Sequence, residues 1–154
     1  PWTHAPFWVR DAAEVKLQVV DADPFERGTS RALLNMGHTV GHAVESMVVA
    51  LGLDYGHGDC VALGLSVESR ILDALGQPGS AERSALRDRI AADFELGALR
   101  NLDSAAVWAA MQHDKKKRAG ELRIVWSPEP GAPEIVLGID EETFTTAWIA
   151  DAAH

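Results

Sequence analysis

One stretch rich in histidine and glycine, from residue 31 to residue 59, limits the possible folds of this chain more than any other: RALLNMGHTVGHAVESMVVALGLDYGHGD. In its first part, apolar residues recur at spacings of three and four, which predicts a helix with one buried face. Polar residues with the same spacing line a neighbouring stripe, namely Arg31, Asn35, His38, His42 and Glu45. The stretch therefore predicts one helix with one side in the core and another on a cavity or on water.

Two glycines, Gly37 and Gly41, lie inside this predicted helix. In a helix interior each costs about 1 kcal/mol relative to alanine. A cost carried twice within one turn indicates that something approaches the backbone closely. We expect either a neighbouring helix or a ligand at that point.

The histidines of the stretch are candidate metal ligands. His38 and His42 are spaced so that two imidazoles one helical turn apart can reach one metal ion, although a pair of partly exposed histidines bonded to water has the same spacing. His57 follows on a glycine-flanked turn just before another apolar helix. A histidine that arrives from a different element is typical of catalytic metal sites, which keep one coordination position open. Spacing alone makes His42 a candidate third ligand.

Composition and charge exclude several classes of protein. With 154 residues, 47% hydrophobic and 24% charged, the chain has the composition of an ordinary soluble domain. The net charge of −9 argues against a nucleic-acid-binding surface. No apolar run approaches the roughly 20 residues of a membrane span, and no signal peptide is evident, so we expect a cytoplasmic protein without membrane contact. The single cysteine, Cys60, is expected to serve packing.

The rest of the chain predicts further helices and a hairpin, and thus a mainly α fold. Helices are expected at residues 9–20, 60–75, 80–96, 104–113 and 141–153. Two strands are expected at residues 121–126 and 134–137. The first of these helices is expected to be packed through its apolar residues. The helix at 80–96 is expected to carry a solvated charged face: Glu82, Arg83, Arg87, Asp88 and Arg89. We expect a single helical domain over residues 1–154, with 1–8 as a lead-in.

A longer signature with fixed internal spacing joins the candidate residues: RALLNMGHTVGHAVE at 31–45, HGD at 57–59 and VALG at 61–64. It resembles the signature of 3-dehydroquinate synthase and its sugar phosphate cyclase relatives. Lys16 upstream and the run at 114–116 (DKK) downstream agree with it. The similarity runs from about residue 10 to the end of the chain.

The resemblance implies a fold and partners. Members of the family have an amino-terminal α/β half that binds NAD and a largely helical carboxy-terminal half. This chain resembles the second half alone, so the NAD-binding half is an expected partner. The complete enzyme is expected to be a homodimer that acts on a small anionic sugar phosphate.

The resemblance also implies roles for individual residues. His38 and His57 would bind Zn²⁺ or Co²⁺, with a glutamate from the missing half as the third protein ligand. His42, Asn35 and Lys115 would lie beside the leaving phosphate. Lys16 and Arg31 would bind the substrate carboxylate, and Glu45 is expected to orient a histidine.

Three interpretations remain open at this point. In the first, the chain is the zinc- and substrate-binding half of a 3-dehydroquinate synthase. In the second, it belongs to a secondary-metabolism cyclase, such as one resembling aminodehydroquinate synthase. In the third, it is a remnant that binds a metal or a partner without catalysis. The pair of Arg31 and Lys16 favours a substrate with a carboxylate, and so the first interpretation.

Overall fold

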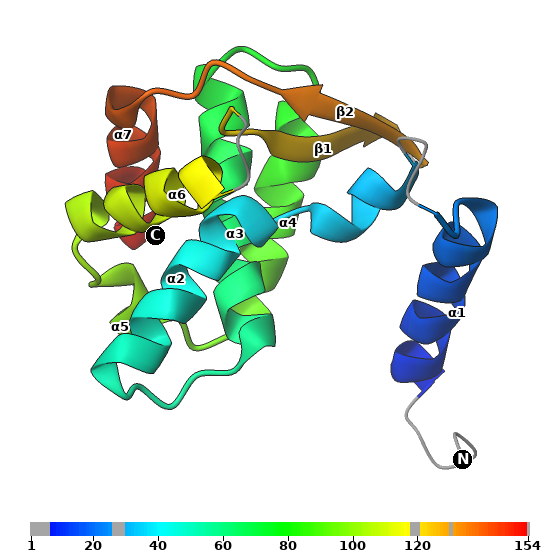
Figure 1. Cartoon of the computed structure of the whole chain (residues 1–154), viewed down its shortest axis with the longest axis horizontal. Helices are drawn as coiled ribbons and strands as arrows, with labels where there is room; N and C mark the ends of the chain where they lie inside the picture. Colours follow the sequence, from blue (N-terminus) through cyan, green and yellow to red (C-terminus); the bar gives the residue numbers. More distant parts are fainter. Residues whose placement is uncertain (1–6, 26–29, 118–120, 130, 154) are drawn as a thin grey trace.

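A computed structural model describes residues 7–25, 30–117, 121–129 and 131–153. Helices dominate, and a small hairpin lies near the carboxy-terminal end (Figure 1). The helices are α1 (Phe7–Ala22), the 3-10 helix η1 (Ser30–Asn35), α2 (His38–Leu51), α3 (His57–Ala74), α4 (Ser80–Asp93), α5 (Gly97–Arg100), α6 (Ser104–Lys117) and α7 (Glu141–Ala152). The strands are β1 (Ile124–Glu129) and β2 (Ala132–Val136), paired antiparallel. The predicted fold class, mainly α with a small hairpin, is therefore confirmed.

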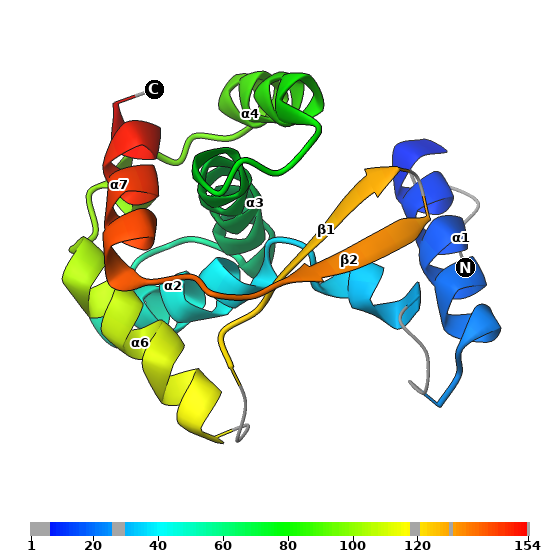
Figure 2. The ribbon, with the colours of Figure 1, turned by 90° about the horizontal axis from the view of Figure 1, so that it is seen from above.

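Helix α3 forms the centre of the bundle. It packs against α2, α4, α5 and α7, and in the view of Figure 2 these helices are arranged around it. Apolar side chains of α3 are fully buried at Leu63, Val67 and Ile71. On the far side of the core, Phe144 of α7 stacks on Trp108 of α6 with ring centroids 5.4 Å apart. The apolar helix predicted from the sequence thus lies at the centre of the bundle, while α6 packs against α2 and α7.

The close approach predicted from the glycines is confirmed, and the neighbour is α3. A Cβ atom built on Gly64 would lie 2.0 Å from the carbonyl oxygen of Gly37. A Cβ atom on Gly41 would lie 3.1 Å from the Cα atom of Val61. Since these contacts involve backbone atoms on both helices, no side chain fits between α2 and α3 here.

The prediction of one continuous helix from residue 31 onward is wrong. Residues 30–35 form the short 3-10 helix η1, and α2 begins only at His38. Between them, Gly37 adopts a left-handed backbone conformation with φ of 74°, which a continuous helix does not contain. Arg31 and Asn35 therefore do not share a helix with the histidines, although they directly precede them.

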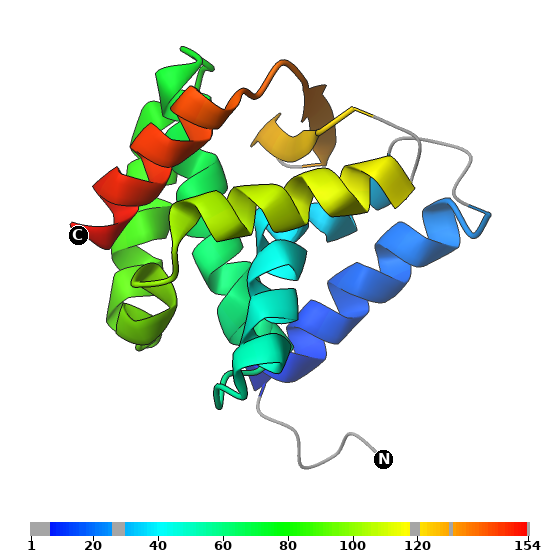
Figure 3. The same ribbon diagram turned by 60° about the vertical axis from the view of Figure 1, so that its left-hand side comes forward.

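The prediction that the first helix is packed through its apolar residues is also wrong. Helix α1 extends over Phe7–Ala22, slightly beyond the expected range, and makes its main contacts with η1. Phe7 is 74% exposed and Leu17 is 60% exposed. Figures 1 and 3 show α1 at the edge of the bundle. Most of the expected lead-in, residues 1–6, lies outside the described residues.

The solvated face predicted for the helix at 80–96 is wrong for its two inner arginines. Arg83 is 0% exposed, and its guanidinium donates to the Oδ1 atom of Asp73 and to the backbone carbonyls of Gln77 and Pro78. Arg87 donates to the Oδ2 atom of Asp73 at 2.8 Å. These arginines attach α4 to the end of α3, because Asp73 and the loop carbonyls satisfy their charge and donors.

A second buried ionic network was not predicted. Asp151 of α7 is buried and accepts hydrogen bonds from Ser66, from Arg70 at 3.0 Å and from Arg100 at 2.9 Å. Its carboxylate therefore joins α7 to α3 and to the short helix α5. The sequence could not indicate this network, since the four residues come from three separate helices.

The remaining boundaries differ from the predicted ones by a few residues. Helix α4 ends at Asp93 and is followed by the unexpected short α5, while α6 continues past His113 to Lys117. Asp140 caps α7 as predicted, accepting a hydrogen bond from the Thr143 amide at 2.8 Å. Within the described ranges, no helix has the length and apolar content needed to cross a membrane.

Candidate metal and substrate site

Three imidazole rings lie together on the facing sides of α2 and α3. His38 is the first residue of α2, His42 lies one turn further along, and His57 is the first residue of α3. The ring centroids are 5.2 Å apart for His38 and His42, and 5.3 Å apart for His38 and His57. Those of His42 and His57 are 6.0 Å apart. The structure thus brings together the three histidines of the sequence signature.

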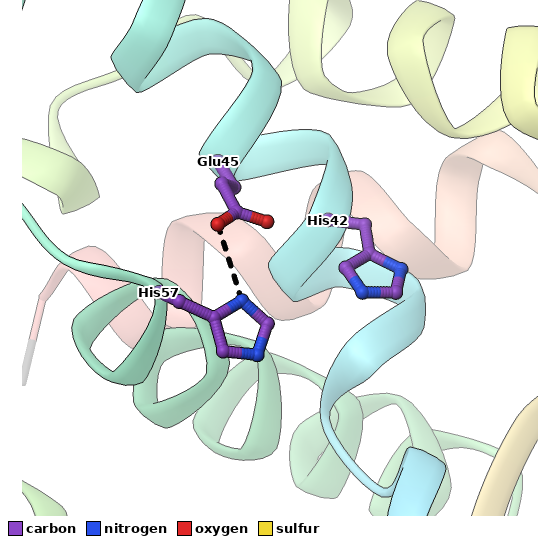
Figure 4. A group of neighbouring side chains, drawn as sticks. All are labelled: His42, Glu45 and His57. Atoms are coloured by element: carbon purple, nitrogen blue, oxygen red, sulfur yellow. Dashed lines mark hydrogen bonds and ion pairs between the residues drawn. The ribbon is translucent and has the colours of Figure 1, made fainter.

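The glycine contacts explain why the rings meet. Gly37 lies against Gly64 and Gly41 lies against Val61, so α2 and α3 run antiparallel at close range. As a result, the start of α3 lies beside the second and third turns of α2. Figure 4 shows His57 directed from α3 toward Glu45, with His42 on the adjacent turn of α2.

The prediction that His57 lies on a turn is wrong, because His57 is the first residue of helix α3. The Gly56 amide donates to the Oδ2 atom of Asp59 at 2.9 Å, a bond typical of a helix start. Because of this bond, α3 begins three residues before the expected Cys60. The ring position of His57 is therefore held by a helix and not by a loop.

In His38 and His57, one ring nitrogen lies within hydrogen-bond distance of an oxygen atom. The Nδ1 atom of His38 lies 2.9 Å from the carbonyl oxygen of Met36. The Nδ1 atom of His57 lies 3.2 Å from the Oε1 atom of Glu45. When Nδ1 carries the proton for such a bond, Nε2 presents its lone pair to a metal, which is the usual arrangement of histidine ligands. The donor chemistry therefore fits a metal ion bound by His38 and His57.

A second possible ligand set uses Glu45 directly. Ligand atoms of His42, Glu45 and His57 all lie within 4.8 Å of one another. In this set Glu45 would bind the metal, whereas in the first it orients His57. The pocket next to the cluster favours the first set, because His38 and His57 both line it and His42 is not among its described lining residues.

The pocket lies between α3 and α4 and has a volume of about 440 Å³. That volume is in the range of small-molecule sites. Its walls are mostly apolar, with Val61 and Leu65 from α3 and Phe94 at the end of α4. The two histidines therefore open onto a largely apolar hollow that can admit a small ligand.

The structure adds a residue that the sequence did not indicate, Glu68 in the middle of α3. Its buried carboxyl accepts hydrogen bonds from the backbone amides of Gly37 and Val40, both at 3.0 Å. Burial raises the pKa of Glu68 to about 8, and the amides of Val40, Gly37 and Thr39 oppose this rise. No sequence spacing connects Glu68 with α2, so only the packing of the two helices reveals it.

The other predicted site residues lie on η1, α1 and α6. Arg31 is half-buried in η1, and Asn35 is exposed at its end, just before His38. Lys16 is exposed on α1, which packs against η1. Lys115 lies in the last turn of α6, and its side chain lies outside the described residues. A shared role of these side chains with the histidines stays a prediction.

Cys60 is fully buried between α2 and α3. Burial raises the pKa of its thiol, and the negative charges of Glu45 and Asp59 raise it further. A neutral, buried thiol agrees with the predicted packing role.

The fold and the cluster together define a helical domain that carries potential metal ligands beside a small pocket. The model of the family described as 3-dehydroquinate synthase C-terminal matches residues 3–117 of the chain. This match covers the whole histidine signature and most of the bundle, and the chain therefore belongs to the 3-dehydroquinate synthase C-terminal family.

Proposed function

We propose that this chain is the metal- and substrate-binding part of a 3-dehydroquinate synthase. The reaction would convert 3-deoxy-D-arabino-heptulosonate 7-phosphate into 3-dehydroquinate and phosphate, a step of the shikimate pathway. The observation that carries the proposal is the pair His38 and His57, which line one pocket with each Nδ1 atom already engaged by an oxygen. Membership of the family supports the same reaction class.

His38 and His57 would hold a zinc or cobalt ion through their Nε2 atoms. Bound there, the ion would supply Lewis-acid polarisation of substrate hydroxyl oxygens. Glu45 would keep the His57 ring oriented and its Nε2 atom basic, as the hydrogen bond at 3.2 Å indicates. A glutamate from the NAD-binding half would complete the ligand set.

The anionic groups of the substrate would be bound by the neighbouring cations. Arg31 can hold a carboxylate through two parallel hydrogen bonds, and Lys16 would add a second positive charge. His42, Asn35 and Lys115 would bind the leaving phosphate. His42 would also move a proton during elimination, since an imidazole changes charge near neutral pH.

The proposal includes the expected partners and setting of the domain. Residues 1–154 would act as one domain together with an NAD-binding half. The complete enzyme would form a homodimer in the cytoplasm. The exposed apolar residues of α1 are compatible with further contacts in such an assembly.

Metal titration tests the first part of the proposal. We expect Co²⁺ to bind the chain with a visible absorption band typical of nitrogen ligands. His38→Ala and His57→Ala should each weaken this binding at least tenfold, because each removes a ligand. His113→Ala is the matched control, since His113 is an exposed histidine on α6. Equal binding by all four proteins would refute the metal site.

Turnover of the heptulosonate phosphate tests the second part. The chain is expected to be inactive alone and active when an NAD-binding half of the family is added with NAD and zinc. Turnover only of an amino-substituted or neutral sugar phosphate would favour the secondary-metabolism cyclase. Metal binding without turnover in any pairing would favour a non-catalytic remnant. Arg31→Ala should impair substrate binding in the reassembled enzyme far more than it impairs folding.

A further inference from the structure

The buried carboxyl of Glu68 lies against the first turn of α2, on the side of that helix that packs on α3. Its Oε2 atom accepts from the Gly37 amide and its Oε1 atom from the Val40 amide, both at 3.0 Å. These two amides lie before and after His38 in the chain. The carboxyl therefore holds the backbone on both sides of a proposed metal ligand.

The start of α2 needs such a partner from elsewhere in the chain. The first amides of any helix lack acceptors within it, and a side chain at the N-cap position usually bonds the amide of the second or third residue. Here the N-cap residue is Gly37, which has no side chain. A larger residue does not fit, because its Cβ atom would lie 2.6 Å from the Cγ atom of Leu65 and φ is 74°. Glu68 supplies from α3 the acceptor that Gly37 lacks.

We propose that Glu68 is a positioning residue for His38, acting through the backbone amides on both sides of it. This inference rests on the metal site of the proposed function. With the first turn of α2 held in place, the Nδ1 atom of His38 stays within hydrogen-bond distance of the Met36 carbonyl, and Nε2 stays directed at the metal position. Without the carboxyl, the first turn loses its acceptor and the ring loses its fixed orientation.

Two substitutions separate this role from a general contribution to stability. Glu68→Gln keeps the shape and one acceptor oxygen, but its amide nitrogen faces one of the two backbone amides as a second donor. Asp151→Asn is the matched control. It alters an equally buried carboxyl of the same bundle, bonded to Ser66 and Arg70 and not to α2. The thermal stability of both variants is measured beside that of the parent chain, so that a general loss of stability is recognised.

Two measurements on the 154-residue chain test whether Glu68 positions His38. The first is Zn²⁺ affinity, determined by competition with a chelator. The second is the tautomer of His38 in the metal-free protein, determined from long-range proton–nitrogen NMR correlations. Glu68→Gln should lower Zn²⁺ affinity about tenfold or more, the usual effect of removing support from a ligand. It should also replace the single Nδ1–H tautomer of His38 by a mixture, whereas Asp151→Asn should leave both measurements unchanged.

Several outcomes would overturn the inference. One is a Glu68→Gln variant with the Zn²⁺ affinity and the His38 tautomer of the parent chain. Another is an equal loss in Asp151→Asn, which would assign the effect to general destabilisation. Failure of the proposed function is recognised separately, because Zn²⁺ would then bind the parent chain and His57→Ala equally. In that case the His38 tautomer in the metal-free variants still determines whether Glu68 orients the ring.

Discussion

The close contact between Gly64 and the start of α2 predicts that Gly64→Ala destabilises the chain. The added methyl group would lie 2.0 Å from the carbonyl oxygen of Gly37 and 2.8 Å from the amide nitrogen of Gly41. Ordinary contact begins at 3.4 Å, so the backbone at Gly37 has to withdraw by about 1.4 Å. No flexible side chain can absorb this movement, because both neighbours are backbone atoms.

The size of the effect follows from two opposing contributions. Overpacking costs about 1–3 kcal/mol, and the rigid backbone partners place this site near the upper value. Alanine also favours the helix over glycine by about 1 kcal/mol, which offsets part of the cost. The net loss in the free energy of unfolding is then about 2 kcal/mol, or about 4–8 °C in the melting temperature for a domain of this size.

Gly58→Ala is the matched control, since Gly58 lies on the same helix and has no heavy atom within 4 Å of a built Cβ. Its melting temperature should stay the same or rise slightly. Thermal unfolding followed by far-ultraviolet circular dichroism measures both variants. Zn²⁺ affinity should also fall in Gly64→Ala, because the withdrawal of the backbone at Gly37 moves the neighbouring His38 away from His57. A Gly64→Ala variant at least as stable as the parent chain would refute the close approach of the two helices.

Three further predictions concern buried polar groups. Arg83→Met should destabilise the chain by about 3 kcal/mol in urea unfolding, because it removes one of the two arginines that pair with Asp73 and takes the guanidinium donor from two backbone carbonyls; unchanged stability would contradict the structural role of Arg83. The pKa of Glu68 is raised from 4.5 to about 8 in the folded state, so the folded state binds a proton that the unfolded state releases. The metal-free chain should therefore lose stability relative to Glu68→Gln as pH rises from 4.5 to about 8, by on the order of 4 kcal/mol, and a difference independent of pH would contradict this. The thiol of Cys60 should react with a thiol reagent only as fast as the chain unfolds, because it is fully buried, and rapid labelling of the native chain would show otherwise.

Local sequence patterns predicted those parts of the fold that depend on periodicity and caps. Helix α7 with its cap at Asp140, the apolar centre of α3 and the hairpin follow from such patterns. The same holds for the close approach at Gly41, since glycine in a helix interior has an energetic cost that close packing has to offset. Gly37 also lies close to α3, but it precedes α2 and is not inside a helix. The signature of the family likewise identified the histidines that the fold brings together.

Features that depend on which helices pack together were not predictable. Arg83 and Arg87 have the spacing of a surface stripe, and only the position of Asp73 on α3 makes them buried partners. The break at Gly37 was missed because the polar spacing continues across it, although φ there is left-handed. Glu68 was missed for the same reason as Asp151: its partners lie on other elements, and no local pattern records them.

The central claim is that His38 and His57 share one metal ion, and a Zn²⁺ titration followed by imidazole nitrogen NMR tests it most directly. The account predicts that the Nε2 resonances of His38 and His57 shift together until one equivalent of Zn²⁺ is bound, while the ring nitrogens of His42 keep their positions. A titration in which His42 and His57 shift together and His38 does not would contradict it, and would assign the metal to the set of His42, Glu45 and His57.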